Sequence, residues 1–348
     1  MIFWSLLCVF LLFILLIVAI GSILSAPGHK GPATDHFNGK TFINPTGQKA
    51  KGLSDVLKWL LKRDQGSWKY SYETTVGPKP VDSSTELLIT FVNHSTFLIQ
   101  WNNLNILTDP VWSERCSPFS FAGPRRMRPP GINFDDLPPI DAILLSHNHY
   151  DHLDLNTVKK LHKLYQPVFI VPLGVEKLLQ LHEIDNCVSL DWWQSTSIGL
   201  KITATPAQHF SSRGMFDRDK TLWCGFTLTD GHQKLYFAGD SGYGPFFKEI
   251  GKKEGPMDVS LIPIGAYEPK WFMSPIHVSP KQAINIHEDV KSKQSIAMHF
   301  GTFPLADDGQ GFLDGDARQH GRRLVQRLQA QVDAGRNDPA LERAVGGD

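Results

Sequence analysis

The sequence predicts an α/β protein with two β-sheets covered by helices and one membrane-spanning helix at its N-terminus. Three observations predict this fold class. An uncharged apolar stretch opens the chain, strands dominate the part that follows, and strands then alternate with helices. The sequence has no internal repeat, so we expect one folded domain behind the anchor.

Composition narrows the classes of function. The chain has 348 residues, of which 41% are hydrophobic and 20% charged, which is enough to bury a sizeable core and argues against disorder. Lys plus Arg and Asp plus Glu both number 35, and the resulting zero formal charge argues against nucleic-acid binding by bulk electrostatics. The four cysteines form no CxxC pair, so we expect neither a disulfide framework nor a thiolate zinc site.

The first element is a predicted transmembrane anchor over residues 1–25. No residue from Ile2 to Ile23 is charged, and a helix of that length spans roughly 33 Å at about 1.5 Å per residue, which matches a bilayer core. A cleaved signal peptide is the alternative, but the chain starts without a basic residue, and Pro27 would follow a cut after Ala26. We therefore expect an uncleaved single-pass anchor.

Residues 26–50 are expected to form an extended linker, because they are rich in Gly, Pro, Asn and Thr. All lysines near the anchor follow it, so the positive-inside rule favours a cytoplasmic position for the rest of the chain. These lysines are Lys30, Lys40, Lys49 and Lys51.

Residues 51–308 are expected to form the folded domain. Its first part is predicted to hold strands at Leu87–Gln100, Leu104–Leu107, Ala142–Leu145 and Val168–Val171, with helices at Leu53–Arg63, Asn156–Tyr165 and Val175–His182. Its second part is predicted to hold strands at Leu200–Thr205, Gly225–Thr229, Lys234–Ala238, Val259–Ile264 and Ser295–Met298, and a helix at Pro280–Val290. The dipeptide Asp230-Gly231 predicts a hairpin turn between two of these strands.

Residues 309–348 form a C-terminal tail that is rich in Arg and Ala and differs in composition from the domain. The segment Gln319–Ala334 can be drawn as an amphipathic helix. The tail is either a surface helix of the domain or the product of a frameshift or fusion.

The strongest chemical signal is an HxHxDH motif directly after the predicted strand Ala142–Leu145. Its residues are His147, His149, Asp151 and His152. Residues two apart in an extended chain point the same way, so His147 and His149 can bind one cation together. Asp151 and His152 follow where the chain turns into the next helix, and they can serve a second cation. Neutral imidazole and carboxylate suit zinc, and also iron or manganese.

Three more candidate ligands each follow a predicted strand by a few residues. They are His209, Asp240 and His299. Each alone is more often an ordinary loop residue, but strands that end at one edge of the sheets could gather all three beside the motif. Together with the motif they form a seven-ligand set, which is enough for a dinuclear site.

The motif and these three positions resemble the metallo-β-lactamase superfamily. Longer stretches resemble, more narrowly, the N-acylphosphatidylethanolamine-hydrolysing phospholipase D family. These stretches are Thr108-Asp109-Pro110, Leu137–Ala142, Asp191-Trp192-Trp193, Ile262–Met273 (IPIGAYEPKWFM) and His299–Ala306 (HFGTFPLA). The resemblance covers about Lys40 to Ala306, and it implies an αββα sandwich with two zinc ions at one edge.

Carried over by position, the resemblance divides the ligands between the two zinc ions. His147, His149 and His209 would hold the first, Asp151, His152 and His299 would hold the second, and Asp240 would bridge them. A hydroxide between the metals would be the nucleophile, since zinc lowers the pKa of bound water to about 7. Asp151, Asp240 and His277 are the expected catalytic residues, with His277 orienting the phosphate or protonating the leaving group.

Three positions near these ligands have more than one interpretation. Asp109 is either a carboxylate partner of a zinc-bound histidine or a simple turn aspartate. His94 is expected to be a buried, hydrogen-bonded histidine rather than a ligand. Ile276 stands where animal members of the family typically carry Gln, so polar contacts and substrate preference are expected to differ there.

The resemblance implies a zinc-dependent phosphodiesterase of phospholipase D type that hydrolyses N-acylphosphatidylethanolamine or a related glycerophospholipid to phosphatidic acid and N-acylethanolamine. The expected partners are a phospholipid substrate and a membrane, with a homodimer as an open option and without nucleic acid. A lactonase or small phosphodiester hydrolase with the same metals is the first alternative, because one fold hosts many reactions. A membrane-anchored scaffold without activity is the second.

Overall fold

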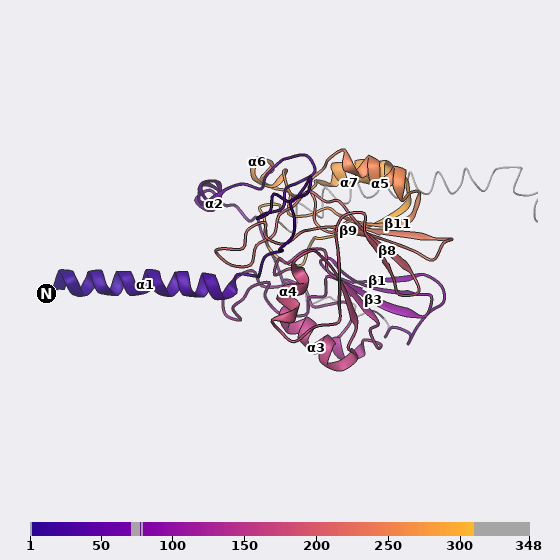
Figure 1. Cartoon of the computed structure of the whole chain (residues 1–348), viewed down its shortest axis with the longest axis horizontal. Coiled ribbons are helices and arrows are strands. Elements are labelled where there is room, and N and C mark those ends of the chain that lie inside the picture. The colour runs from indigo at the N-terminus through magenta and orange to yellow at the C-terminus, as the bar shows by residue number, and fades with distance from the viewer. Residues whose placement is uncertain (1, 71–76, 78, 310–348) are drawn as a thin grey trace, which may run out of the picture.

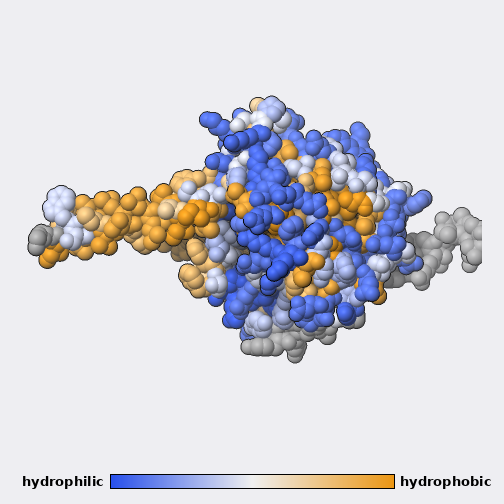
Figure 2. Space-filling model, turned by 60° about the horizontal axis from the view of Figure 1, so that its bottom comes forward, coloured by the Kyte–Doolittle hydropathy of each residue, from blue (hydrophilic) through white to orange (hydrophobic). Residues whose placement is uncertain are grey.

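An N-terminal helix projects from a two-sheet body in the computed structural model, which describes residues 2–70, 77 and 79–309 (Figure 1). Helix α1 (Ile2–Leu24) has no buried side chain, and among the described residues it alone is long and apolar enough to cross a membrane. Figure 2 shows hydrophobic side chains over most of this projecting rod, in contrast with the largely hydrophilic surface of the body. The predicted anchor therefore has the length and the surface that a membrane span requires.

The first sheet has six strands in the order of the sequence. They are β1 (Leu88–Asn93), β2 (Thr96–Trp101), β3 (Leu104–Thr108), β4 (Ala142–Leu144), β5 (Val168–Pro172) and β6 (Cys187–Leu190). Strands β1 to β3 pair antiparallel, and β3 to β6 pair parallel. The parallel strands all end at one edge of the sheet.

The second sheet also has six strands, in the order β12-β11-β10-β9-β8-β7. They are β7 (Ser195–Ser197), β8 (Lys201–Thr205), β9 (Gly225–Thr229), β10 (Lys234–Phe237), β11 (Met257–Pro263) and β12 (Ser292–Met298). Strands β7 to β10 pair antiparallel, and β10 to β12 pair parallel. Strands β8, β10, β11 and β12 consequently run in the same direction and end at the same edge.

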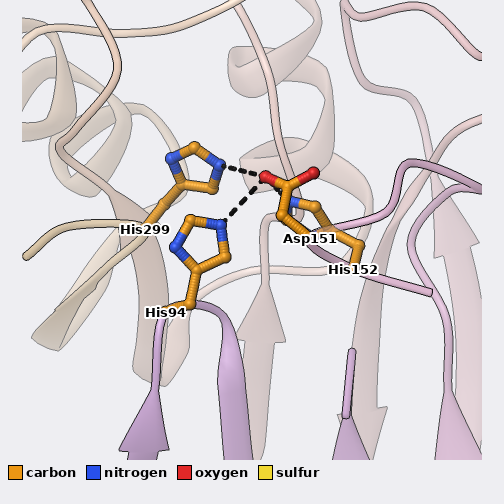
Figure 3. A group of neighbouring side chains, drawn as sticks. All are labelled: His94, Asp151, His152 and His299. Atoms are coloured by element: carbon orange, nitrogen blue, oxygen red, sulfur yellow. Dashed lines mark hydrogen bonds and ion pairs between the residues drawn. The ribbon is translucent and has the colours of Figure 1, made fainter. Parts of the chain in front are cut away.

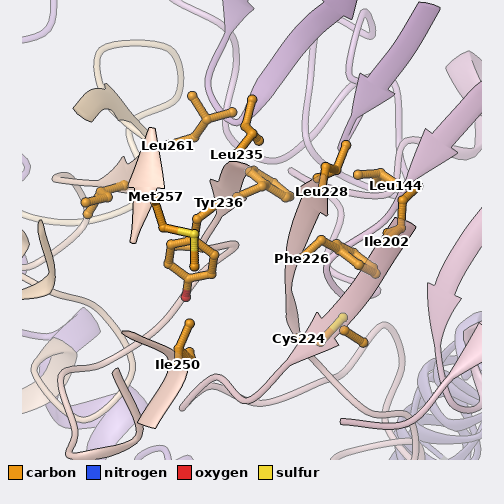
Figure 4. Packing of buried hydrophobic residues seen from close by; sticks show 14 of the residues in the cluster. Leu144, Ile202, Cys224, Phe226, Leu228, Leu235, Tyr236, Ile250, Met257 and Leu261 are labelled. Carbon is orange, nitrogen blue, oxygen red and sulfur yellow. The ribbon is translucent and has the colours of Figure 1, made fainter. Parts of the chain in front are cut away.

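Alternating side chains divide the core into layers. Along β2, Phe97, Ile99 and Trp101 belong to the cluster that joins the two sheets, whereas Leu98 packs into the cluster beneath the helices of the first sheet. The other central strands of the first sheet alternate in the same way. Figure 4 shows part of the cluster that joins the sheets. Both faces of these strands are therefore buried, which explains their nearly continuous apolar sequences.

Helices cover the outer faces of both sheets. Figure 1 shows α3 (Leu155–Tyr165) and α4 (Val175–Gln180) beneath the first sheet, and α5 (Phe246–Lys253) and α7 (Pro280–Asp289) above the second. The side chain of Asp154 caps the N-terminus of α3, and Ser279 with Gln282 forms a capping box at the start of α7. The predicted αββα sandwich is therefore confirmed.

Several elements differ from the sequence prediction. The single strand predicted over Leu87–Gln100 is two strands, because the chain reverses at His94, whose φ is 45°. Strands β6 and β7 and helix α5 were not predicted, and neither was α6 (Lys270–Met273) nor a 3₁₀ turn at Phe134–Asp136. These elements are short, and short segments carry too few residues for a periodic pattern to identify them.

Residues 26–50 contain no helix or strand, but hydrogen bonds and buried side chains attach them to the body. The Ala26 backbone N–H donates to the buried carboxylate of Asp217 at 2.8 Å, and the Phe42 N–H donates to the Asp219 carbonyl at 2.7 Å. Phe37 and Phe42 are buried against the second sheet's loops.

The predicted helix Leu53–Arg63 is present as α2 (Leu53–Leu60) and ends earlier. The predicted tail helix Gln319–Ala334 lies outside the described residues.

Candidate metal centre

The predicted site residues meet at the edge where the parallel strands end. The HxHxDH motif follows β4, while His209 follows β8 and Asp240 follows β10. His299 comes directly after β12, and its φ of 60° turns its side chain away from the strand direction. Both sheets thus deliver side chains to one shared edge, as the sequence predicted.

His147, His149 and His209 form one group, which we call the three-histidine group. The ring atoms His147 Nε2 and His149 Nδ1 are 2.9 Å apart, and His209 Nε2 is 3.2 Å from the same His149 atom. Burial lowers the pKa of His149 and of His209 to about 3, and it also lowers the pKa of His147. These imidazoles are therefore neutral at pH 7, and neutral imidazole is the form that binds a metal.

Asp151, His152 and His299 form a second group, which we call the carboxylate group. Asp151 Oδ2 is 3.4 Å from the Nε2 atoms of both histidines. Figure 3 shows the rings of His299 and His94 facing the carboxylate of Asp151. The Nε2 atom of His94 is 3.0 Å from the same oxygen and donates to it, because an ionised carboxylate can only accept. His94 is thus buried and hydrogen-bonded, as predicted.

Asp240 lies between the two groups. Its Oδ2 atom is 2.9 Å from His299 Nε2 and 3.1 Å from His152 Nε2, and it is also 3.8 Å from His209 Nε2. Burial raises the pKa of Asp240, but the neighbouring His152 and His299 outweigh burial and hold that pKa well below its usual range. A buried carboxylate that stays ionised beside both groups has the position that a bridging ligand requires.

The charge state of the carboxylate group differs from that of the three-histidine group. Although burial opposes it, the carboxylate of Asp240 raises the pKa of His299 to about 9, and it also raises the pKa of His152. The same contacts hold the pKa of Asp151 well below its usual range despite burial. Without a metal, protons on His299 and His152 therefore balance the buried carboxylates, and a bound cation would displace these protons.

Unpartnered atoms test whether these residues fit metal ions. Several buried nitrogen and oxygen atoms at this edge have no hydrogen-bond partner among the described residues. They are His94 Nδ1, His149 Nε2, His152 Nε2, Asp240 Oδ1, His277 Nδ1 and both ring nitrogens of His299. Each such atom costs about 1–3 kcal/mol unless something binds it. Imidazole nitrogens and a carboxylate oxygen that converge without partners fit divalent cations.

Asp109 orients one histidine of each group. The Nδ1 atom of His152 donates to Asp109 Oδ2 at 2.6 Å. The Ser146 hydroxyl donates to the same oxygen at 2.6 Å and accepts from His147 Nδ1 at 2.9 Å. Both histidines therefore carry their proton on Nδ1 and turn Nε2 toward the site. Of the two interpretations of Asp109, the structure supports the carboxylate partner.

His209 is held by a residue that the sequence analysis missed. The side chain of Asn44 accepts from the His209 backbone N–H and donates to the His209 carbonyl, each at 2.9 Å. Asn44 lies in the predicted linker, where no motif or periodic pattern marks it. The segment between the anchor and the domain is consequently part of the support of the site.

His277 is buried beside His209 and Asp240, with its Nδ1 atom 3.9 Å from Asp240 Oδ2. Burial lowers the pKa of His277 to about 3, so its ring is neutral. The preceding residue, Ile276, accepts the His209 Nδ1–H at its backbone carbonyl at 2.9 Å. This contact uses the backbone, so any residue at position 276 can make it. All eight predicted site residues therefore lie at this one edge.

Comparisons with known proteins agree with this geometry. Residues 104–300 match the model of the β-lactamase superfamily domain. The chain is 36% identical over 299 residues to a Caenorhabditis elegans protein named N-acyl-phosphatidylethanolamine-hydrolyzing phospholipase D 1, and the match covers 77% of this chain and 82% of that protein. A Saccharomyces cerevisiae protein, named as the mitochondrial N-acyl-phosphatidylethanolamine-hydrolyzing phospholipase D, is 35% identical over 65% of this chain and 49% of its own length.

Among solved structures, a possible metal-dependent hydrolase from Veillonella parvula has the same fold. It has a TM-score of 0.54 and 17% sequence identity, and the match covers 68% of this chain and 94% of that one. At this low identity the likeness shows the fold alone.

Proposed function

We propose a reaction from the premise that this chain belongs to the N-acylphosphatidylethanolamine-hydrolysing phospholipase D family, within the metallo-β-lactamase superfamily. The chain is a metal-dependent hydrolase. Its proposed substrate is N-acylphosphatidylethanolamine or a related glycerophospholipid, and its proposed products are phosphatidic acid and N-acylethanolamine.

The position of Asp240 between the three-histidine group and the carboxylate group supports this proposal most directly. One buried carboxylate beside two sets of imidazoles is the arrangement that a pair of cations needs. A phosphodiester is the substrate class that paired cations serve well, because they can face both the attacking and the leaving oxygen.

Two zinc ions are the proposed cofactors. The three-histidine group would hold one, the carboxylate group would hold the other, and Asp240 would be shared. Bound zinc would polarise a phosphoryl oxygen and lower the pKa of a bound water to about 7. The ligand types also suit iron or manganese, so the metal content has to be measured.

The reaction consumes one water. A bond forms between the water oxygen and phosphorus, the bond between phosphorus and the ethanolamine oxygen breaks, and that oxygen takes up a proton. His277 is the proposed partner of the phosphate or of the leaving oxygen, because its unpartnered Nδ1 atom lies 3.9 Å from Asp240 Oδ2. A neutral imidazole can donate one hydrogen bond there.

Helix α1 is proposed to anchor the enzyme in the membrane that contains its substrate. Its length and apolar surface fit a single span, and the lysines that follow it favour a cytoplasmic position for the domain. A diacyl phospholipid would then reach the site without leaving the bilayer.

A direct assay tests the proposed reaction. The detergent-solubilised full chain is incubated with N-acylphosphatidylethanolamine, both products are followed by mass spectrometry, and the metal content is measured on the same sample. Asp240→Asn is the control variant. We expect phosphatidic acid and N-acylethanolamine in equal amounts from the wild type alone.

Other results would point to the alternatives. A protein that carries two metal ions and forms neither product would favour a lactone or small phosphodiester substrate. A protein without metal and without products would favour the scaffold interpretation.

A further inference from the structure

His299 lacks the outer partner that steadies most of the other candidate ligands. Hydrogen bonds described above hold the Nδ1 atoms of His147, His152 and His209. The Nδ1 atom of His299 is buried and has no hydrogen-bond partner among the residues that the structure describes. A metal-bound histidine almost always donates its second N–H to a carboxylate, a carbonyl or water. His299 therefore needs such a partner on its Nδ1 side.

His94 has an unpartnered nitrogen beside His299. The two rings are tilted against each other with centroids 4.1 Å apart, and the His299 backbone N–H donates to the His94 carbonyl at 2.8 Å. The Nδ1 atom of His94 is also buried and without a partner among the described residues. Figure 3 shows the second nitrogen of each ring turned away from Asp151. The two rings are thus fixed side by side, and each has one nitrogen that the metal centre does not use.

The protonation states of the two rings make these nitrogens complementary. Burial lowers the pKa of His94 to about 3, so its ring is neutral at pH 7. Its Nε2 atom donates to Asp151, which leaves Nδ1 as an acceptor. When His299 binds a metal through Nε2, its proton lies on Nδ1, which is then a donor. A donor and an acceptor that do not bind each other can share one water molecule.

Asp308 brings a carboxylate to the same place. It is 3% exposed, and its Oδ2 atom accepts from the Ala266 N–H at 2.9 Å, which fixes the side chain. Burial raises the pKa of Asp308, and the nearby His299 acts against this rise. Asp308, His94 and His299 all line one small cavity, with about 10 Å³ for the centre of a water molecule. That volume is room for about one water.

One water in this cavity would satisfy all three side chains. It would accept from the Nδ1–H of His299, and it would donate one proton to His94 Nδ1 and the other to the carboxylate of Asp308. Three hydrogen bonds are the usual number for a buried water. Phe303, Leu305 and Ala306 also line the cavity, and their apolar side chains do not compete for these bonds.

We propose that Asp308 is a positioning residue of the metal centre, which holds the Nδ1–H of His299 through one bound water that His94 shares. Asp308 would then do for His299 what Asp109 does for His152. This inference rests on the proposed metal site, but it does not depend on the identity of the substrate.

Metal competition tests the proposal on the detergent-solubilised full chain. A chelator removes zinc in steps, and His209→Ala identifies the step of the three-histidine group because it deletes a ligand of that group alone. Asp308→Ala removes the proposed carboxylate. We expect an affinity about 10-fold weaker in the carboxylate group alone, at the lower end of the range for outer partners of metal-bound histidines.

Two further variants separate positioning from packing. Asp307→Ala is the matched control, because Asp307 lies in the same loop but accepts from Trp59 Nε1–H at 2.9 Å. We expect it to leave the metal affinity of both groups unchanged. Asp308→Asn keeps a side-chain oxygen that can accept from the water, so it should recover most of the affinity that Asp308→Ala loses.

A spectroscopic measurement serves if Asp308→Ala does not fold. In the Co²⁺-loaded protein, the N–H protons of metal-bound histidines give NMR signals far outside the normal range. We expect one of these signals to move in Asp308→Asn, because the acceptor of the water changes, and none to move in Asp307→Ala. Signals that stay in place in Asp308→Asn would overturn the link through water.

The remaining outcomes separate this inference from the proposed function. Unchanged affinity in Asp308→Ala would overturn the role of Asp308, and so would equal losses in Asp307→Ala or in both groups. A wild type that binds no metal in the carboxylate group would overturn this inference together with the proposed metal centre. A selective loss in a protein that forms no phosphatidic acid would support the role of Asp308 and reject only the proposed substrate.

Discussion

The three-histidine group and the carboxylate group lie at one edge of the fold but are built from different chemistry. The first consists of imidazoles that burial keeps neutral, and the second pairs imidazoles with the ionised Asp151. Their outer supports differ too. His209 depends on Asn44, whereas Asp151 depends on His94. Among the described residues, Asp240, Asp109 and His277 lie beside both groups, so the two groups can be perturbed together or one at a time.

The largest effect is expected for Asp240→Asn. The amide keeps the shape but removes the charge that both groups face, so we expect hydrolysis to fall by about 10²–10³-fold, which is typical for the loss of one electrostatic contact in a buried site. Both metal ions should bind more weakly, as metal analysis after dialysis will show. Loss of one ion alone would mean that Asp240 belongs to a single group.

Asp109→Asn is expected to have the second-largest effect on metal binding. It removes the acceptor that fixes the His152 ring and, through Ser146, the His147 ring. Outer partners of metal-bound histidines are typically worth about 10–100-fold in metal affinity. We expect a loss of that size in both groups, measured by competition with a zinc chelator. An unchanged affinity in the three-histidine group would break the proposed link through Ser146.

His94→Phe separates the groups. The substitution keeps an aromatic ring in a fully buried place but removes the N–H that Asp151 accepts. We expect roughly a 10-fold weaker metal affinity in the carboxylate group alone. The same titration that serves Asp109→Asn reports it. If the second ion were lost completely, His94 would be a direct ligand, and the prediction that it is only hydrogen-bonded would be wrong.

Asn44→Leu perturbs the three-histidine group alone, through the support of His209. Of the four variants it has the smallest expected effect on metal binding. It leaves the His209 N–H without its acceptor, whereas the Trp223 indole N–H keeps its bond to the Ala207 carbonyl. An unsatisfied buried group costs about 1–3 kcal/mol, so the free energy of unfolding should fall by that amount. Denaturant unfolding measures it, and metal analysis should show a weaker three-histidine group. A stable variant with unchanged metal binding would contradict the role of Asn44.

The sequence predicted most of the site because its residues sit in a local pattern. The HxHxDH motif lies in six consecutive residues, and His209, Asp240 and His299 each follow an apolar strand that periodicity identifies. The same logic predicted the two sheets and the helices α3 and α7. Contacts between residues far apart in the sequence could not be predicted in this way. Nothing near Asn44 indicates that it would reach His209, because that contact joins residues 165 positions apart.

Backbone reversals were also hidden from the sequence. His94, Asp109 and His299 all have a positive φ, which residues other than glycine rarely adopt. At His94 this reversal divides one predicted strand into two. Strained backbone of this kind gathers at functional sites, where the surrounding contacts hold it in place. A pattern of apolar and polar residues carries no information about such positions.

The direct passage from α1 into the body has a consequence for how the enzyme would search for substrate. Leu24 ends the helix, and Ala26 is already buried and bonded to Asp217, so the tether between them has almost no slack. A domain held this way cannot reach outward or tumble over its anchor. Its encounters would be set by lateral diffusion within one leaflet, so its rate should follow the mole fraction of substrate in the membrane rather than its bulk concentration.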